Sequence, residues 1–116
     1  MNRYVAIFNE KIEEMKSDKD IEAIFITGSS KDMKFEDEAK DIDIFAITLK
    51  EVDQIRDIKE IQGRIWDINI FSQKSMKQYI EKKEKFMLKA LSENVILYDP
   101  KEIIKSMKLF AEQNNK

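Results

Sequence analysis

The N-terminal part of the chain has apolar residues at helical spacing. Between residues 3 and 16 they recur every three or four positions, with Lys and Glu between them, at Val5, Phe8, Ile12 and Met15. This period places the apolar side chains on one face. The pattern therefore predicts an amphipathic helix over residues 3–16, which Ser17-Asp18 ends.

Three later runs have the composition of β-strands, with many β-branched and aromatic residues. They are IEAIFIT, IDIFAIT and RIWDINIF, at residues 21–27, 42–48 and 64–71. In the third run, alternation predicts two opposite faces: Ile65, Asp67 and Asn69 on one, and Trp66, Ile68 and Ile70 on the other. A shorter run, VILY at residues 95–98, predicts a fourth strand.

The remaining segments give weaker signals. Residues 29–40 are polar and acidic and predict a loop or a short helix, and residues 50–61 predict a weak helix or an irregular strand. Ser72 or Ser75 is placed to cap a long helix that continues through Leu91. Asp99-Pro100 predicts the N-cap and first residue of a last helix through Phe110, followed by a frayed tail.

These elements predict a single α/β (α+β) domain over residues 1–116, with a small mixed sheet of about four strands and helices packed against it. At 116 residues the chain is long enough for one modest core. Hydrophobic residues make up 42% of it and charged residues 38%. The two signs of charge are interspersed, so a solvated surface accounts for most of the charges.

Composition excludes several kinds of chemistry. The chain has no cysteine and no histidine, which removes disulfides, thiolate zinc sites, cysteine nucleophiles and histidine acid–base catalysis. A net charge of −2 argues against a general nucleic-acid binder. No apolar run approaches the length of a membrane span, and no apolar signal core begins the chain, so we expect a cytoplasmic protein.

Three aspartates stand in or beside the predicted strands, where aspartate is depleted. Asp41 and Asp43 are two positions apart and therefore face the same way, a spacing that suits metal ions held between them. The alternative is a solvent-exposed strand end. Asp67 either reaches a metal, pairs with a cation such as Arg64, or lies on a wet face; Asn69 on the same face favours a polar cleft.

Gly28 and Ser29 follow the first predicted strand directly. A tight turn there would let backbone N–H groups and the serine hydroxyl approach a phosphate. An ordinary strand-end turn is the alternative interpretation.

Taken as a set, these motifs are more specific than any one of them. A strand ending in Gly28-Ser29, a spacer, Asp41-x-Asp43 opening a second strand and Asp67 on a later strand resemble the nucleotidyltransferase superfamily that includes DNA polymerase β. The chain is most similar to the minimal, single-domain nucleotidyltransferases, and the resemblance extends over most of its length.

The resemblance implies a role for each matching residue. Asp41, Asp43 and Asp67 would bind two Mg²⁺ ions, and Asp67 would also act as the base for the acceptor hydroxyl. Gly28 and Ser29, with Ser30 and Lys31, would bind the phosphates of an NTP, ATP being the expected one. Two features differ from many relatives: Lys40 precedes the first aspartate, and the segment after Gly-Ser has lysines in place of an arginine and then becomes acidic.

The resemblance also implies a partner, because the chain has little room for an acceptor-binding domain. Minimal nucleotidyltransferases often pair with a helical toxin of the HEPN type and act as its antitoxin, in some cases by adding AMP to it; a homodimer is the alternative. From the residues we expect an interface on the C-terminal helices that uses Met76, Tyr79, Met107 and Phe110. The alternative is that these four side chains fill the core.

Overall fold

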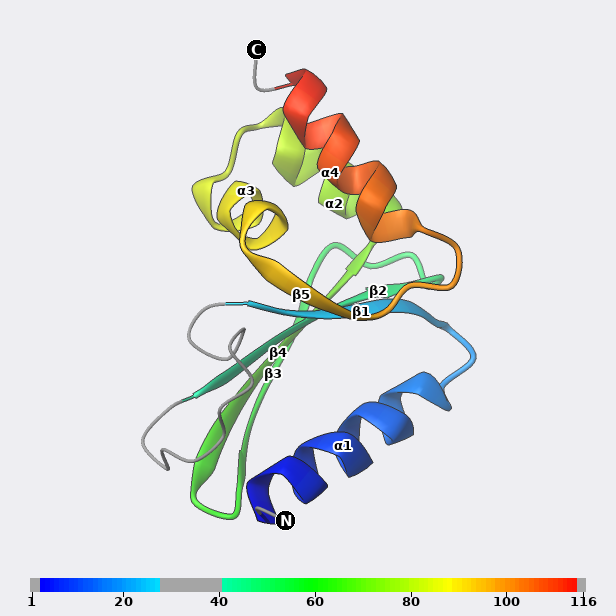
Figure 1. The fold of residues 1–116 in the computed structure, drawn as a ribbon. Helices are drawn as coiled ribbons and strands as arrows, with labels where there is room; N and C mark the ends of the chain where they lie inside the picture. Colours follow the sequence, from blue (N-terminus) through cyan, green and yellow to red (C-terminus); the bar gives the residue numbers. More distant parts are fainter. Residues whose placement is uncertain (1–2, 28–40, 115–116) are drawn as a thin grey trace.

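The computed structural model describes residues 3–27 and 41–114 of the chain (Figure 1). Gly28, Ser29, Ser30 and Lys31, with the rest of segment 28–40, lie outside the described residues. The strands are β1 (Ile21–Thr27), β2 (Ile42–Thr48), β3 (Ile55–Ile61), β4 (Arg64–Ser72) and β5 (Asn94–Tyr98). The helices are α1 (Arg3–Lys16), α2 (Gln73–Glu81), α3 (Lys85–Ser92) and α4 (Ile103–Asn114).

The strands form one mixed sheet in the order β3-β4-β2-β1-β5. Strands β2 and β4 pair in parallel, and all other neighbours pair antiparallel. The predicted fold class is confirmed, with five strands where the sequence predicted about four. The four predicted strands and the N-terminal helix are present, with bounds that agree to within one residue.

Helices cover both faces of the sheet, with α1 on one face and α2, α3 and α4 on the other (Figure 1). Between α1 and the sheet lies an apolar layer that includes Phe8 of α1, Trp66 of β4 and the isoleucines of the central strands. The opposite layer joins aromatic residues of β1, β2 and β4 to the three C-terminal helices. Met76 and Met107 lie in that core, 0% and 1% exposed, so the expectation that they form a partner interface was wrong.

Of the two structures predicted for residues 50–61, a weak helix or an irregular strand, the strand is confirmed: β3 covers Ile55–Ile61. Strand β3 is one of the two outer strands of the sheet, and most of its residues are exposed on both faces. Such a strand needs no apolar alternation, and its isoleucines happen to lie three apart, which resembles a helical period. A two-residue turn, Gln62-Gly63, joins β3 to β4, and both residues have positive φ, 54° and 79°. This geometry fits the tight turn that matches the twist of a β-hairpin.

The predicted long helix after β4 is two helices. Ser72 caps α2, since its hydroxyl accepts a hydrogen bond of 3.1 Å from the Ser75 N–H, as one of the two expected caps should. Lys83, with φ of 57°, interrupts the helix, and α3 begins two residues later. Left-handed backbone cannot continue a right-handed helix, so α3 takes a new direction over the sheet.

The last helix begins later and ends later than predicted. Asp99 does cap it, with its carboxylate accepting from the N–H groups of Ile103 at 2.7 Å and Ile104 at 3.0 Å. The first helical residue is nevertheless Ile103, because Glu102 has a φ of 54°. Residues 111–114 are helical, where a frayed tail was expected.

Among the helices that the structure describes, none combines the length and the apolar composition that crossing a bilayer would require.

Candidate functional site

Asp43 and Asp67 are neighbours in the sheet. They are directly paired residues of the parallel strands β2 and β4, so their side chains leave the same face. The flanking residues Ile42, Ile44, Trp66 and Ile68 are buried beneath α1 on the opposite face. Because side chains alternate along a strand, burying those four directs both aspartates towards the side of α2–α4.

Asp41 immediately precedes β2 and is exposed. It lies near enough to Asp43 for its negative charge to affect that residue. We refer to Asp41, Asp43 and Asp67 as the acidic corner. The strand register places Asp43 and Asp67 on one face, and Asp41 is placed beside them only through its charge on Asp43.

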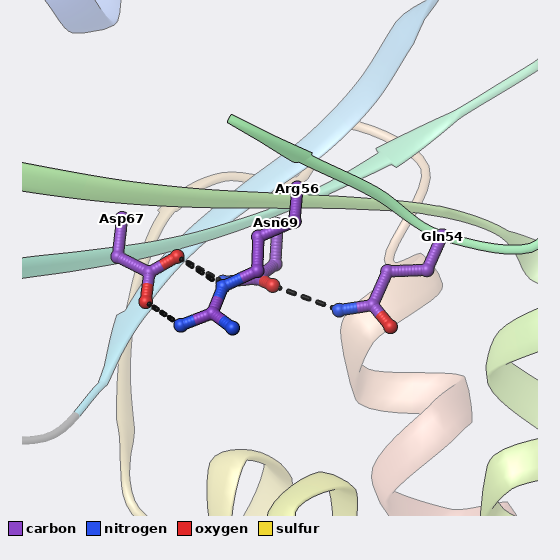
Figure 2. Close-up of polar contacts among 4 residues, drawn as sticks. All are labelled: Gln54, Arg56, Asp67 and Asn69. Carbon is purple, nitrogen blue, oxygen red and sulfur yellow. Dashed lines mark hydrogen bonds and ion pairs between the residues drawn. The ribbon is translucent and has the colours of Figure 1, made fainter. Parts of the chain in front are cut away.

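Asp67 is held by two neighbouring side chains (Figure 2). Arg56 of β3 donates through Nε to Oδ1 at 3.0 Å and through Nη2 to Oδ2 at 2.8 Å. Asn69 donates through Nδ2 to Oδ1 at 3.1 Å and accepts from Gln54 Nε2 at 2.9 Å. Both carboxylate oxygens of Asp67 are therefore engaged by a bidentate guanidinium, the strongest common form of ion pair.

The two paired carboxylates have opposite shifts in pKa. The hydrogen bonds and charge of Arg56 hold the pKa of Asp67 below its ordinary 3.8. Burial raises the pKa of Asp43 above 3.8, and the negative charges of Asp67 and Asp41 raise it further. The corner thus concentrates negative charge that one guanidinium offsets in part, which is an environment that favours an added cation.

The donor chemistry of the corner fits a hard divalent cation, since Mg²⁺ prefers carboxylate oxygens. Within residues 3–27 and 41–114, however, no group of three acidic side chains is placed so that it could hold a metal ion. One reason is visible in Figure 2, where the oxygens of Asp67 are directed at Arg56. The carboxylates fit as ligands, but Asp67 must release Arg56 before it can serve as one.

A hollow of about 230 Å³ lies beside the acidic corner, between the sheet and α3. Its lining includes Thr27, which pairs with Asp43 in the sheet, and Phe45, two positions beyond Asp43 on the same face. Phe86, Lys89, Ala90 and Glu93 line the rest. The hollow offers an aromatic wall and one lysine next to the carboxylates.

A larger hollow of about 480 Å³ lies at the opposite end of the strands, near Thr48 and Ser72. Its wall contains the buried Glu22 carboxylate, which accepts a hydrogen bond from Gln73 at 3.1 Å and pairs with Lys101 at 3.5 Å. Thr48 is five positions beyond Asp43 on β2, so strand geometry places this hollow about 16 Å from the corner. We therefore take the smaller hollow as the one that adjoins the candidate site.

Sequence reasoning found the three aspartates but not the partner of Asp67. Arg64 was one suggested partner, and it lies on the opposite face with Trp66, because both alternate with Asp67 along β4. The partner is Arg56, which was missed because the sequence left residues 50–61 open between a helix and an irregular strand and did not pair them with β4. An arginine seven positions before the glycine of a hairpin turn, Gly63, would have been the signal.

Comparison with known proteins supports the fold. No family model matches the chain, and no curated protein matches it. Among solved structures it is similar to a nucleotidyltransferase-like protein from Exiguobacterium sibiricum 255-15, with a TM-score of 0.72 and 9% sequence identity. The match covers 94% of this chain and 38% of that protein. At this identity the similarity shows a shared nucleotidyltransferase-like fold and nothing finer.

Proposed function

We propose that this protein is a Mg²⁺-dependent nucleotidyltransferase that transfers AMP from ATP to a hydroxyl group of a partner protein. The observation that carries the proposal is the direct pairing of Asp43 with Asp67 on adjacent parallel strands, within a nucleotidyltransferase-like fold. Asp41 directly precedes β2, the strand that carries Asp43. Three carboxylates at one corner of a sheet supply the oxygen ligands that metal-assisted phosphoryl chemistry requires.

Each residue of the corner then has a role. Asp41, Asp43 and Asp67 would together hold two Mg²⁺ ions, which when bound would offset charge on the attacking and leaving oxygens. Asp67 would accept the proton of the acceptor hydroxyl at a carboxylate oxygen. The new bond joins the acceptor oxygen to the α-phosphorus, the bond from that phosphorus to the β-phosphate oxygen breaks, and pyrophosphate leaves with the electron pair.

We place the nucleotide with its base in the hollow next to Asp43, where Phe45 and Phe86 offer an apolar wall and Lys89 a positive charge. We further propose that Gly28, Ser29, Ser30 and Lys31, which follow β1 in the sequence, bind its β- and γ-phosphates. Backbone N–H groups at such a strand end suit phosphate oxygens.

We propose a HEPN-type helical protein as the acceptor, with this chain as its antitoxin-like partner. Nucleotidyl transfer needs an acceptor hydroxyl held in line with the α-phosphorus. With Met76 and Met107 in the core, the acceptor surface is best sought around the exposed Ile58 and Ile65, which flank Asp67 on the face of the corner.

Nucleotide binding tests the proposal most directly. By titration calorimetry, ATP should bind when Mg²⁺ is present at millimolar concentration and should bind much more weakly without it, because the acidic corner repels a bare triphosphate. Asp43→Asn should remove the Mg²⁺-dependent component. Asp57→Asn is the matched control, since Asp57 pairs with Ile68 and faces the other side of the sheet.

Two outcomes would replace this proposal. Folded protein that binds no ATP with Mg²⁺ or Mn²⁺ would identify the chain as an inactive binding module that retains the fold. If ATP binds, the chain should be incubated with the adjacent gene product and ATP labelled in its α-phosphate. Label transferred only to small hydroxylated compounds would indicate an antibiotic-type enzyme instead of a protein-modifying one.

A further inference from the structure

Arg56 occupies the groups that the proposed metal site needs. Its guanidinium contacts both oxygens of Asp67, at 3.0 and 2.8 Å. Those oxygens also carry the lone pairs that would bind a cation. Arg56 and a divalent cation would therefore compete for the oxygens of Asp67.

Arg56 is free to move in a way that Asp67 is not. The Arg56 side chain is 57% exposed on an outer strand of the sheet, whereas Asp67 is 19% exposed on an inner strand. Asp67 also keeps a second contact, since Asn69 donates to Oδ1 and is itself held by Gln54. Loss of the arginine contact would leave Asp67 oriented and ready to accept another partner.

The position of Arg56 also suits a second role. Its charge acts on Asp43 as well as on Asp67, so the guanidinium lies close to both of the paired carboxylates. A nucleoside triphosphate bound there brings several phosphate oxygens, and guanidinium binds phosphate in the same bidentate manner as carboxylate. A displaced Arg56 would therefore find a new anionic partner without leaving the corner.

We propose that Arg56 exchanges partners when substrate binds, releasing Asp67 to the divalent cation and binding a phosphate of the nucleotide. The inference rests on the proposed function, because it requires both a cation and a nucleotide at the acidic corner. It makes Arg56 a phosphate-binding residue of the site and an inhibitor of premature metal binding. The two roles have opposite effects on the binding of metal and of nucleotide, and that opposition can be measured.

Arg56→Gln in the full chain separates the two roles. Mn²⁺ alone, titrated by electron paramagnetic resonance, should bind the variant roughly two- to fivefold more tightly than the unmodified protein, as expected from loss of an exposed competing ion pair. ATP with Mg²⁺, titrated by calorimetry, should bind the variant roughly three- to tenfold more weakly, because a charged phosphate contact is lost. A merely structural role for Arg56 would not change the two affinities in opposite directions.

Lys59→Gln is the matched control, since it removes the same charge from the same strand. Lys59 pairs with Asp57 at 3.2 Å and lies beside Trp66 in the sheet register, on the opposite face. It should leave both affinities within about twofold of the unmodified protein. Arg56→Lys keeps the charge but loses the two-pronged contact, and its Mn²⁺ affinity should lie between those of the unmodified protein and Arg56→Gln.

Three results would overturn the exchange. If Arg56→Gln binds Mn²⁺ no more tightly than the unmodified protein does, the arginine does not compete with metal. If Arg56→Gln binds ATP as tightly as the unmodified protein does, the arginine does not contact the phosphates. If Lys59→Gln changes the Mn²⁺ and ATP affinities as much as Arg56→Gln does, both changes result from the loss of one positive charge on β3 and not from the contact with Asp67. If the unmodified protein binds Mn²⁺ and Asp43→Asn does not, such a failure concerns Arg56 alone; if neither protein binds Mn²⁺, the proposed function fails as well.

Discussion

The two faces of the sheet receive alternate residues from the same strands, yet they differ in character. Towards α1, strands β2 and β4 present only apolar residues along most of their length, including Ile42, Ile44, Trp66 and Ile68. Towards α2–α4, β2 presents Asp43 before the buried Phe45 and Ile47, and β4 presents the exposed Ile65 and then Asp67 and Asn69 before the buried Phe71. Apart from the buried Arg64 at the start of β4, the first face is apolar where α1 covers it, whereas the second carries carboxylates at one end and a core at the other.

This difference indicates how the fold accommodates a cluster of negative charge. Burial of unpaired carboxylates is costly, so they are tolerated only where helices leave the sheet partly open or where a cation pairs with them. The face under α1 supplies the packing that compensates, and it fixes the direction in which the aspartates point. Substitutions on the two faces should therefore have effects of different size and of different sign.

The largest effect is expected on the face under α1. Trp66 is 1% exposed and packs against Phe8, with ring centroids 5.9 Å apart. Trp66→Ala should lower the free energy of unfolding by about 3–5 kcal/mol, because it leaves a large cavity. Ile65→Ala is the control on the neighbouring position of β4; Ile65 faces the other side and is exposed, so it should cost less than about 1 kcal/mol. If urea denaturation shows similar losses in the free energy of unfolding for Trp66→Ala and Ile65→Ala, the expected difference between the two faces is wrong.

A smaller effect is expected where α4 covers the opposite face. Met107 is buried, and Leu109, two positions later on the same helix, is 53% exposed. Met107→Ala should lower the free energy of unfolding by about 2–5 kcal/mol, and Leu109→Ala by less than about 0.5 kcal/mol. A tolerated Met107→Ala would restore the hypothesis that this residue belongs to a partner surface and not to the core.

The smallest effect should have the opposite sign. The folded protein raises the pKa of Asp43 through burial and through the charges of Asp67 and Asp41. At neutral pH the ionised carboxylate therefore destabilises the fold, and Asp43→Asn should raise the free energy of unfolding by at most about 0.5 kcal/mol, because solvent screens the charges at this half-buried position. The same substitution should remove metal-dependent ATP binding, so stability and function would change in opposite directions.

The pH dependence provides the check on that sign. Because the folded pKa of Asp43 exceeds 3.8, its penalty develops as pH rises above 3.8 and is complete above the folded pKa. The stability difference between Asp43→Asn and the unmodified protein should accordingly be largest at neutral pH and disappear below pH 3.8. A difference that persists in acid would assign the effect to packing and not to charge.

The sequence predicted best the elements whose patterns are fixed by burial. Helix α1 and strands β1, β2 and β4 have strong apolar periodicity because they cover or form the core, and alternation alone placed Asp67 opposite Trp66. Strand β3 was uncertain because an outer strand exposed on both faces has no such constraint. The break at Lys83 and the start of α4 only after Glu102 depend on left-handed backbone at residues other than glycine, which composition does not reveal.

The residues of the candidate site also divide into those that the sequence could predict and those that it could not. Its aspartates could be found because they interrupt apolar runs, where their presence needs an explanation. Arg56 could not, since an arginine among exposed charges is ordinary until its strand partner is known. Its contact with Asp67 joins residues 11 positions apart, and the pairing of β3 with β4 creates that contact.

The Gln62-Gly63 turn therefore does more than reverse the chain, because it also sets the register of β3 against β4. It aligns Ile61 with Arg64, and from that alignment it follows that Arg56 stands opposite Asn69, on the side of the acidic corner. Side chains alternate with a period of two, so a slip by one residue would present Asp57 to the corner in place of Arg56. The register set by the Gln62-Gly63 turn thus decides whether a positive or a negative side chain of β3 lies next to Asp67, although the turn itself contacts none of the site residues.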